Sequence, residues 1–303
     1  MIEDFALVHA HYPLAFPLAA LVVGALVGSF LNVVVYRLPI MLNREWQQQA
    51  IAIIDESVND PTVAQNLRKH LPQSAEKFNL LFPGSRCPSC GSAIRPWHNI
   101  PVIGYFLIGG KCASCEAAIG LRYPIVEGAT ALLTMTVMMA FGPTLSGAAL
   151  IVLTWALIAL ALIDYDTQLL PDDITLPLLW LGLVVNFFGL VTPFGNAFLG
   201  ACLGYLVLWV VFQLFKLVTG KEGMGYGDFK MLAMLGAWLG VQSLPLIIIL
   251  SSFAGAVIGG AMIAFGRDRT KPIKFGPFLA IAGWIAMMWG DQILARYLAL
   301  TTV

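Results

Sequence analysis

Long apolar runs separated by short polar stretches constrain the fold of this chain more than any other feature. A helix needs about 20 mostly apolar residues to cross the hydrocarbon core of a bilayer. Eight segments of the sequence are candidates: 14–36, 124–142, 146–165, 174–191, 196–216, 229–241, 244–265 and 276–298. The sixth is short and runs almost directly into the seventh, so a tight hairpin or a half-span would fit that pair as well. The sequence therefore predicts an all-α polytopic membrane protein with about eight transmembrane helices.

The composition agrees with a membrane protein. Of the 303 residues, 59% are hydrophobic and 11% are charged, whereas soluble domains carry about 25% charged residues. The net charge is zero, which gives no reason to expect nucleic-acid binding. The stretch before the first apolar run has no Lys or Arg, so it lacks the basic region of a secretory signal peptide. We therefore interpret 14–36 as a retained first span.

Basic residues are distributed unequally between the two ends of the predicted spans. Nine of the seventeen Lys and Arg residues lie between the first and second spans. Cytoplasmic loops carry an excess of Lys and Arg, so this segment is predicted to face the cytoplasm. Threading eight spans from there places sixteen of the seventeen basic residues on the cytoplasmic side and only Arg296 outside.

The long polar segment after the first span is predicted to form a separate domain. We expect a first transmembrane helix within 1–36, a cytoplasmic domain over 37–123 and a transmembrane core over 124–303. Residues 41–80 are polar and helix-prone, and are predicted to form one or two short helices that break at Pro61.

Four cysteines in this domain form two CxxC pairs, Cys87/Cys90 and Cys112/Cys115. Each pair presents two thiolates from one turn, and two such turns complete a tetrahedral set of four sulfur ligands for zinc. The 21 residues between the pairs slightly exceed the usual gap of about 15–20 in zinc ribbons. With four thiolates the zinc would be structural, and His98 is not needed as a ligand. Free thiols or a redox pair are the alternatives.

Two carboxylates stand out because they lie at the cytoplasmic ends of predicted transmembrane spans. Asp164 still belongs to the apolar run WALIALALID, and Asp228 follows the glycine-rich GMGYG at the start of the sixth run. Ionisable groups at membrane depth are costly and usually functional. Two adjacent carboxylates suggest aspartic proteolysis, in which one takes a proton from water and the other, protonated, polarises the scissile carbonyl. Helix capping is the alternative for Asp228, and also for Asp172 or Asp173.

Eight motifs lie along nearly the whole chain: GSFLNVVVYRLP (28–39), CPSC (87–90), HNIPVIGY (98–105), CASC (112–115), RYPIVE (122–127), IDYDTQLLPD (163–172), GKEGMGYGDFK (220–230) and FGPFLAIAGW (275–284). The stretch GYGD in one of them matches the GxGD signature of membrane aspartyl proteases. Together and in this order, the motifs resemble those of the type IV prepilin peptidases, which are bifunctional leader peptidases and N-methyltransferases.

The resemblance implies a function and its site. Such an enzyme sits in the bacterial inner membrane and cleaves the short basic leader of type IV prepilins and type II secretion pseudopilins after Gly, at the cytoplasmic face. It then methylates the new N-terminal amine with S-adenosylmethionine. The family's catalytic aspartates match Asp164 and Asp228, with Asp166 and Asp172 as lesser candidates in the same motif. Prepilins, pseudopilins and membrane lipid are the expected partners.

The methyltransferase half has no recognisable nucleotide-binding motif. No strand–glycine-turn–helix unit is evident, so Glu45, Asn99 and Glu127 are only loosely arguable as contributors. Two other functions stay open: a peptidase without methylation, and a transporter with acidic groups on its ion path. A transporter is expected to show midplane carboxylates or broken helices in paired halves, whereas these acids gather at one face.

Overall fold

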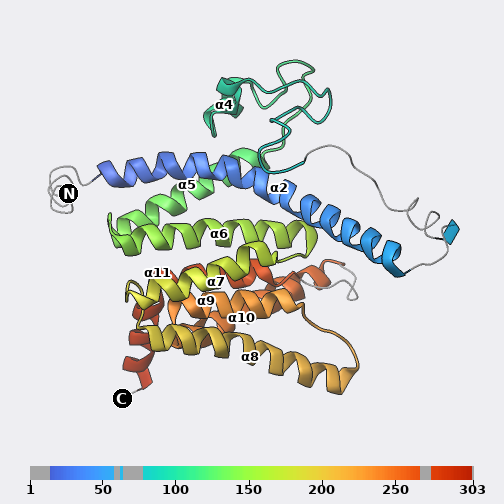
Figure 1. Cartoon of the computed structure of the whole chain (residues 1–303). Coiled ribbons are helices and arrows are strands. Elements are labelled where there is room, and N and C mark those ends of the chain that lie inside the picture. Colours follow the sequence, from blue (N-terminus) through green and yellow to red (C-terminus); the bar gives the residue numbers. More distant parts are fainter. Residues whose placement is uncertain (1–13, 58–61, 64–77, 267–273, 302–303) are drawn as a thin grey trace. The chain divides into compact units, whose positions relative to one another are not determined.

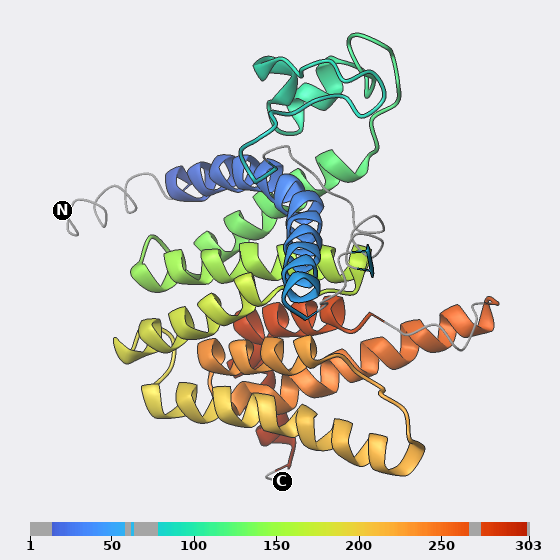
Figure 2. The ribbon, with the colours of Figure 1, turned by 45° about the vertical axis from the view of Figure 1, so that its right-hand side comes forward.

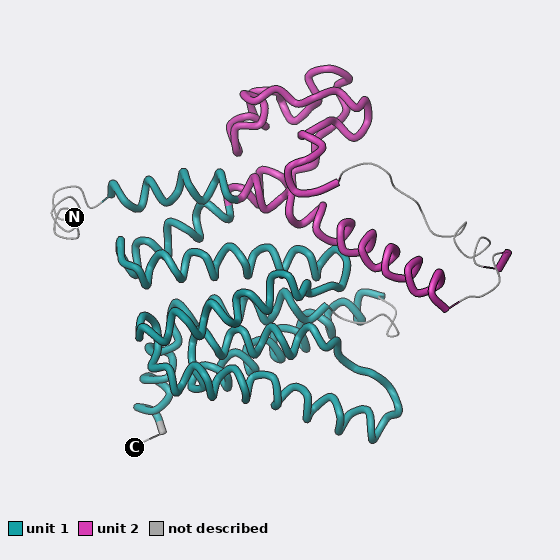
Figure 3. Tube along the Cα trace, viewed as in Figure 1, with its two compact units in different colours: residues 1–27, 129–303 teal, residues 28–128 magenta. Residues whose placement is uncertain are grey.

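The computed structural model describes residues 14–57, 62–63, 78–266 and 274–301. The chain divides into two compact units, one of residues 1–27 and 129–303 and the other of residues 28–128 (Figure 3). Regular structure in the described residues is helical, apart from two isolated β-bridges. The predicted all-α fold is therefore confirmed.

Each of the eight apolar runs forms a helix (Figure 1). The helices are α2 (Ala15–Ser57), α5 (Arg122–Phe141), α6 (Leu145–Thr167), α7 (Asp172–Phe187), α8 (Phe194–Thr219), α9 (Tyr226–Leu239), α10 (Leu244–Ala264) and α11 (Gly276–Thr301). Within the described ranges, six helical segments are long and apolar enough to cross a membrane. With 16 and 14 residues, α7 and α9 are not among these six, so a count of eight full spans stays a prediction.

The first helix differs from the sequence-based expectation. Residues 41–57 were expected to belong to separate short helices, but they continue α2 without interruption, and Pro39 lies inside the helix. Local polarity does not end a helix, because the backbone hydrogen bonds continue when side chains change from apolar to polar. The predicted break at Pro61, with most of 58–77, lies outside the described residues.

In the larger unit, α9 is the central element. It contacts α7, α8, α10 and α11, and Figures 1 and 2 show it beside α7 and α8. Nearly every residue from Asp228 to Trp238 is buried. A helix that is apolar on all sides packs inside a protein, and one of 14 residues is about 21 Å long, shorter than the roughly 30 Å hydrocarbon core. Protein therefore surrounds α9.

The ends of the helices in this unit follow local sequence signals. Thr144 caps α6 by accepting a hydrogen bond from the Gly147 N–H at 3.0 Å. Gly220 ends α8 with φ +68°, and Gly240 ends α9 with φ +82°. Both glycines adopt the left-handed φ that side chains disfavour. The aspartates lie at the opposite ends of these two helices, Asp164 in the last turn of α6 and Asp228 in the first turn of α9.

Candidate active site and metal centre

Asp164 lies in the last turn of α6 and is 5% exposed. The N–H of Gly276, the first residue of α11, donates to its Oδ2 at 2.9 Å. The helix ends three residues later, because Gln168 takes a left-handed conformation and donates its N–H to the Asp164 carbonyl. Asp164 is thus held at a helix end by a segment more than a hundred residues away in sequence.

Asp228 lies in the first turn of α9 and is 8% exposed. The N-cap of α9 is Gly225, so Asp228 is not the capping residue, but its place in the first turn agrees with the expected stabilisation by the helix dipole. A Cβ on Gly227 would lie 2.8 Å from Leu170 Cβ. At that position the glycine is needed for a close approach between the start of α9 and the α6–α7 connection.

The structure brings the two predicted aspartates together within one unit. They are near enough for the charge of Asp164 to act on Asp228. Helix α11 contacts both α6 and α9, and links the elements that carry them. The arrangement is chemically suited to acid–base catalysis in which one carboxylate is ionised and the other protonated.

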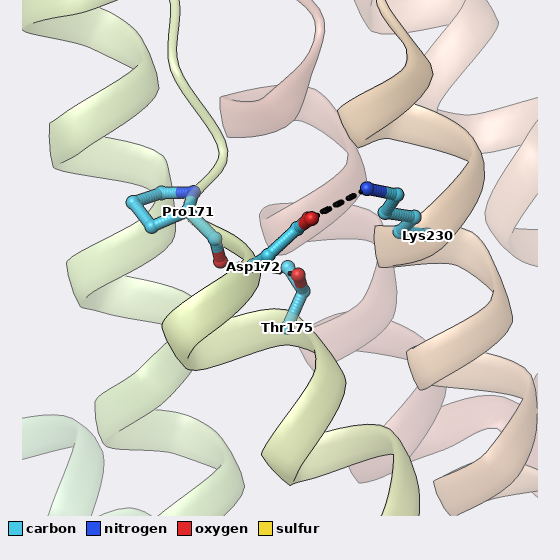
Figure 4. A network of polar contacts seen from close by, with 4 residues as sticks. All are labelled: Pro171, Asp172, Thr175 and Lys230. Carbon is cyan, nitrogen blue, oxygen red and sulfur yellow. Dashed lines mark hydrogen bonds and ion pairs between the residues drawn. The ribbon is translucent and has the colours of Figure 1, made fainter. Parts of the chain in front are cut away.

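The other acidic residues of the IDYDTQLLPDD stretch have different surroundings. Asp166 is exposed on the last turn of α6. The N-cap of α7 is Pro171, so capping by Asp172 or Asp173 is also wrong. Asp172 instead accepts hydrogen bonds from Lys230 of α9 at 2.8 and 2.7 Å, beside Thr175 and Pro171 (Figure 4).

The four cysteines gather at one point of the smaller unit, at the apices of two similar turns. Their sulfur atoms all lie within 4.8 Å of one another. Each turn lies between the two residues of an isolated bridge, Arg86–Ala93 for the first and Lys111–Ala118 for the second. The residue after each second cysteine has a positive φ, +71° at Gly91 and +57° at Glu116. Two equivalent turns thus present two sulfurs each.

The donor set fits a tetrahedral metal ion. Zinc–sulfur bonds of about 2.3 Å place the sulfurs of a tetrahedral site about 3.8 Å apart, and the Sγ atoms of Cys87 and Cys115 are 3.8 Å apart. Backbone N–H groups of Ser114 and Cys115 lower the pKa of the Cys112 thiol to about 6, whereas the neighbouring thiols raise the pKa of Cys115 to about 12. His98 lies on a short 3-10 helix (Pro96–Asn99) outside this cluster.

Glu127, one of the methyltransferase candidates, and the nearby Asn32 make structural contacts. The Glu127 carboxylate accepts a hydrogen bond from the Val102 N–H at 2.7 Å. Val102 has φ +60°, which is rare for a β-branched residue. Asn32 of α2 donates an interhelical hydrogen bond to the Tyr123 carbonyl of α5 at 3.2 Å. Glu45 lies on α2 and Asn99 ends the 3-10 helix.

Comparison with known families places this architecture in a class of membrane peptidases. Residues 22–141 match the Bacterial Peptidase A24 N-terminal domain, and residues 151–260 match the Type IV leader peptidase family. No solved structure gives a significant match.

Curated relatives match over nearly the whole chain. A prepilin leader peptidase/N-methyltransferase of Pseudomonas aeruginosa is 56% identical over 290 residues, covering 95% of this chain and 96% of the relative. The proteins of the same name from Stutzerimonas stutzeri and Neisseria gonorrhoeae are 54% and 46% identical. The chain therefore belongs to the prepilin leader peptidase/N-methyltransferase family, as its sequence motifs predicted.

Two residues near Asp164 were not identified from the sequence, although both lie in or next to the FGPF motif. Gly276 donates to the carboxylate. Lys274 donates to the carbonyl of Tyr165, the next residue after Asp164. A glycine at the start of a helix and a lysine before it are common features, so no local signal connects them to an aspartate on α6.

Proposed function

We propose that this chain is a multi-pass membrane enzyme that removes the leader of type IV prepilins and pseudopilins and then N-methylates the new N-terminus. The observation that carries the proposal is the buried pair Asp164 and Asp228. It occurs in a chain that matches the Type IV leader peptidase family and is 56% identical to a prepilin leader peptidase/N-methyltransferase.

The two aspartates would perform the cleavage together. The ionised carboxylate takes a proton from water as the water oxygen attacks the scissile carbonyl, and the protonated carboxyl donates to the carbonyl oxygen. The tetrahedral intermediate then collapses, the C–N bond breaks, and the leaving amine takes a proton. That amine is the new N-terminus of the pilin, which is the atom that becomes methylated.

The position of the pair fits a substrate anchored in the membrane. Asp164 lies in the last turn of α6, a candidate span, so the scissile bond lies at one membrane face. We assign this face to the cytoplasm of the bacterial inner membrane, because most basic residues flank the same ends of the spans. A prepilin helix that enters from the lipid would bring its leader junction to this edge.

The second activity would use S-adenosylmethionine as methyl donor, which supplies an electrophilic methyl group to the free amine. We place structural zinc at Cys87, Cys90, Cys112 and Cys115, where the donor set fits it. All four ligand positions are then filled by protein, so the metal stabilises the domain and takes no part in either reaction.

Separate assays of the two activities test the aspartate assignment. Purified enzyme in detergent is given a prepilin, a pre-cleaved pilin and labelled S-adenosylmethionine. Asp164→Asn and Asp228→Asn are each expected to lose at least about 10³-fold in leader removal, because an amide can neither take nor donate the required proton. Both variants should still methylate the pre-cleaved pilin. Cleavage near the wild-type rate by either variant would reject the pair and direct attention to Asp166 or Asp172.

A further inference from the structure

The start of α11 is built around the Asp164 side chain. The Gly276 N–H donates to Asp164 Oδ2 at 2.9 Å. A Cβ on Gly276 would lie 2.8 Å from Oδ2 and 3.0 Å from the Asp164 Cβ. No side chain fits at residue 276 without displacing the carboxylate, because atoms this close must move apart. The glycine therefore allows the backbone amide to reach the aspartate.

Lys274 makes a second set of contacts with the same helix end. Its Nζ donates to the carbonyl of Tyr165 and lies 4.9 Å from the centre of the Tyr165 ring. The ammonium charge also acts on Asp164. Lys274 thus holds the C-terminal turn of α6 and supplies a positive charge beside its aspartate.

Two other charges near the aspartate pair have different partners. Lys230, the cation on α9, is bonded to Asp172. The charge that acts on Asp228 is that of Asp164 itself. The amide of Gly276 and the ammonium of Lys274 therefore favour the negative charge on Asp164, since donors to a carboxylate stabilise its ionised form.

We propose that Lys274 and Gly276 are positioning residues for leader cleavage, which orient Asp164 as the carboxylate that takes the proton from water. The inference rests on the proposed function. It extends the site beyond the two helices that carry the aspartates, because Lys274, just before α11, and the first amide of that helix become part of the peptidase machinery. Neither residue takes part in methyl transfer.

A pair of glycine variants on α11 tests the role of Gly276. In Gly276→Ala the new methyl group displaces Asp164, and misplacement of a catalytic group by about 1 Å can cost about 10²-fold in rate. We expect kcat for leader removal to fall about 10²-fold and KM to stay within about threefold. The matched control is Gly283→Ala, whose Cβ would lie 2.6 Å from the Leu235 side chain. That leucine end can move, so the control should keep kcat within about threefold.

Lysine variants test the charge independently. Lys274→Met removes the positive charge and is expected to lower kcat for leader removal about tenfold. Lys274→Arg keeps the charge and should recover most of the rate. A purely steric role of residue 274 would not separate the two variants by charge. Methylation of a pre-cleaved pilin should stay within about twofold of the wild type in all these variants. If Gly276→Ala fails to fold and loses both activities, the comparison of Lys274→Met with Lys274→Arg decides whether the positioning role holds.

Three results would overturn the inference: cleavage by Gly276→Ala within threefold of the wild type, equal losses in Gly276→Ala and Gly283→Ala, or equal kcat for Lys274→Met and Lys274→Arg. Asp164→Asn, assayed in parallel, separates the two levels of the argument. If Asp164→Asn cleaves normally, the proposed site is wrong. If it is inactive while the positioning variants are normal, only the role of Lys274 and Gly276 is rejected.

Discussion

An ion pair between Asp172 and Lys230 joins the first turn of α7 to α9 (Figure 4). Lys230 follows Asp228 by two residues on α9. The side chains are 50% and 30% exposed, respectively. An exposed pair of this kind contributes about 0–1 kcal/mol to stability, because water already solvates both charges and ordering two side chains costs entropy. Its geometric role is to fix the relative position of two helix ends near the aspartate pair.

This contact predicts a clear difference between Asp172 and Asp228. Asp172→Asn should lower the free energy of unfolding by less than about 1 kcal/mol. It should reduce leader removal by less than about tenfold, because the Asp172 carboxylate is already bonded to Lys230. Cleavage assays beside Asp228→Asn, with Asp172→Lys/Lys230→Asp as the charge-reversed control, measure this. An Asp172→Asn enzyme as inactive as Asp228→Asn would place Asp172 in the chemistry.

At the scale of elements, α8 and α9 touch through their backbones. A Cβ on Gly236 of α9 would lie 2.1 Å from the carbonyl oxygen of Gly200, and a Cβ on Gly200 would lie 2.3 Å from that of Gly236. Small residues at such crossings let membrane helices approach closely and gain dispersion contacts. Asn186 secures the far end of α9 by donating to the carbonyls of Ala237 and Trp238 at 2.8 and 2.9 Å.

The crossing predicts a strong stability effect for one methyl group. Gly236→Ala should lower the free energy of unfolding by roughly 1–3 kcal/mol, because rigid backbone rather than a flexible side chain opposes the new Cβ. The control is Gly195→Ala on α8, where a Cβ would meet nothing within 4 Å. Thermal unfolding of the purified protein in detergent compares the two. Equal melting temperatures would show that the helices can separate without cost.

At the scale of the whole molecule, two compact units are stabilised by different means. The larger unit buries apolar helices around α9. In the smaller unit, the segment that holds the cysteines has two isolated bridges and exposed apolar residues such as Leu81, Phe82 and Phe106. Such a segment buries little apolar surface, and a bound metal can supply the missing folding free energy.

Removal of the metal should therefore affect the smaller unit selectively. We expect about one zinc per chain by elemental analysis, and its loss in Cys112→Ser but not in the control Cys202→Ser, which changes an exposed cysteine on α8. Loss of zinc should expose residues 78–121 to limited proteolysis, with fragments identified by mass spectrometry, and should preserve the helices of the larger unit. Equal protection with and without metal would argue against a structural zinc.

The sequence by itself determined the class of structure, because its signals are local. Apolar runs predicted eight helices that the structure contains, although α7 and α9 are not among the six long enough to cross a membrane. The CxxC spacing identified Cys87, Cys90, Cys112 and Cys115, which the structure brings together. The motifs around Asp164 and Asp228 indicated the family, which the full-length relatives confirm.

Only the tertiary structure decided what depends on contacts between distant residues. Local sequence did not show that α2 continues to Ser57 or that α9 is enclosed by other helices. It also gave no sign that the amide of Gly276 reaches Asp164. A local pattern specifies which backbone forms a helix, but packing of separate helices selects which side chains meet. The surroundings of the aspartate pair could therefore be read only from the folded chain.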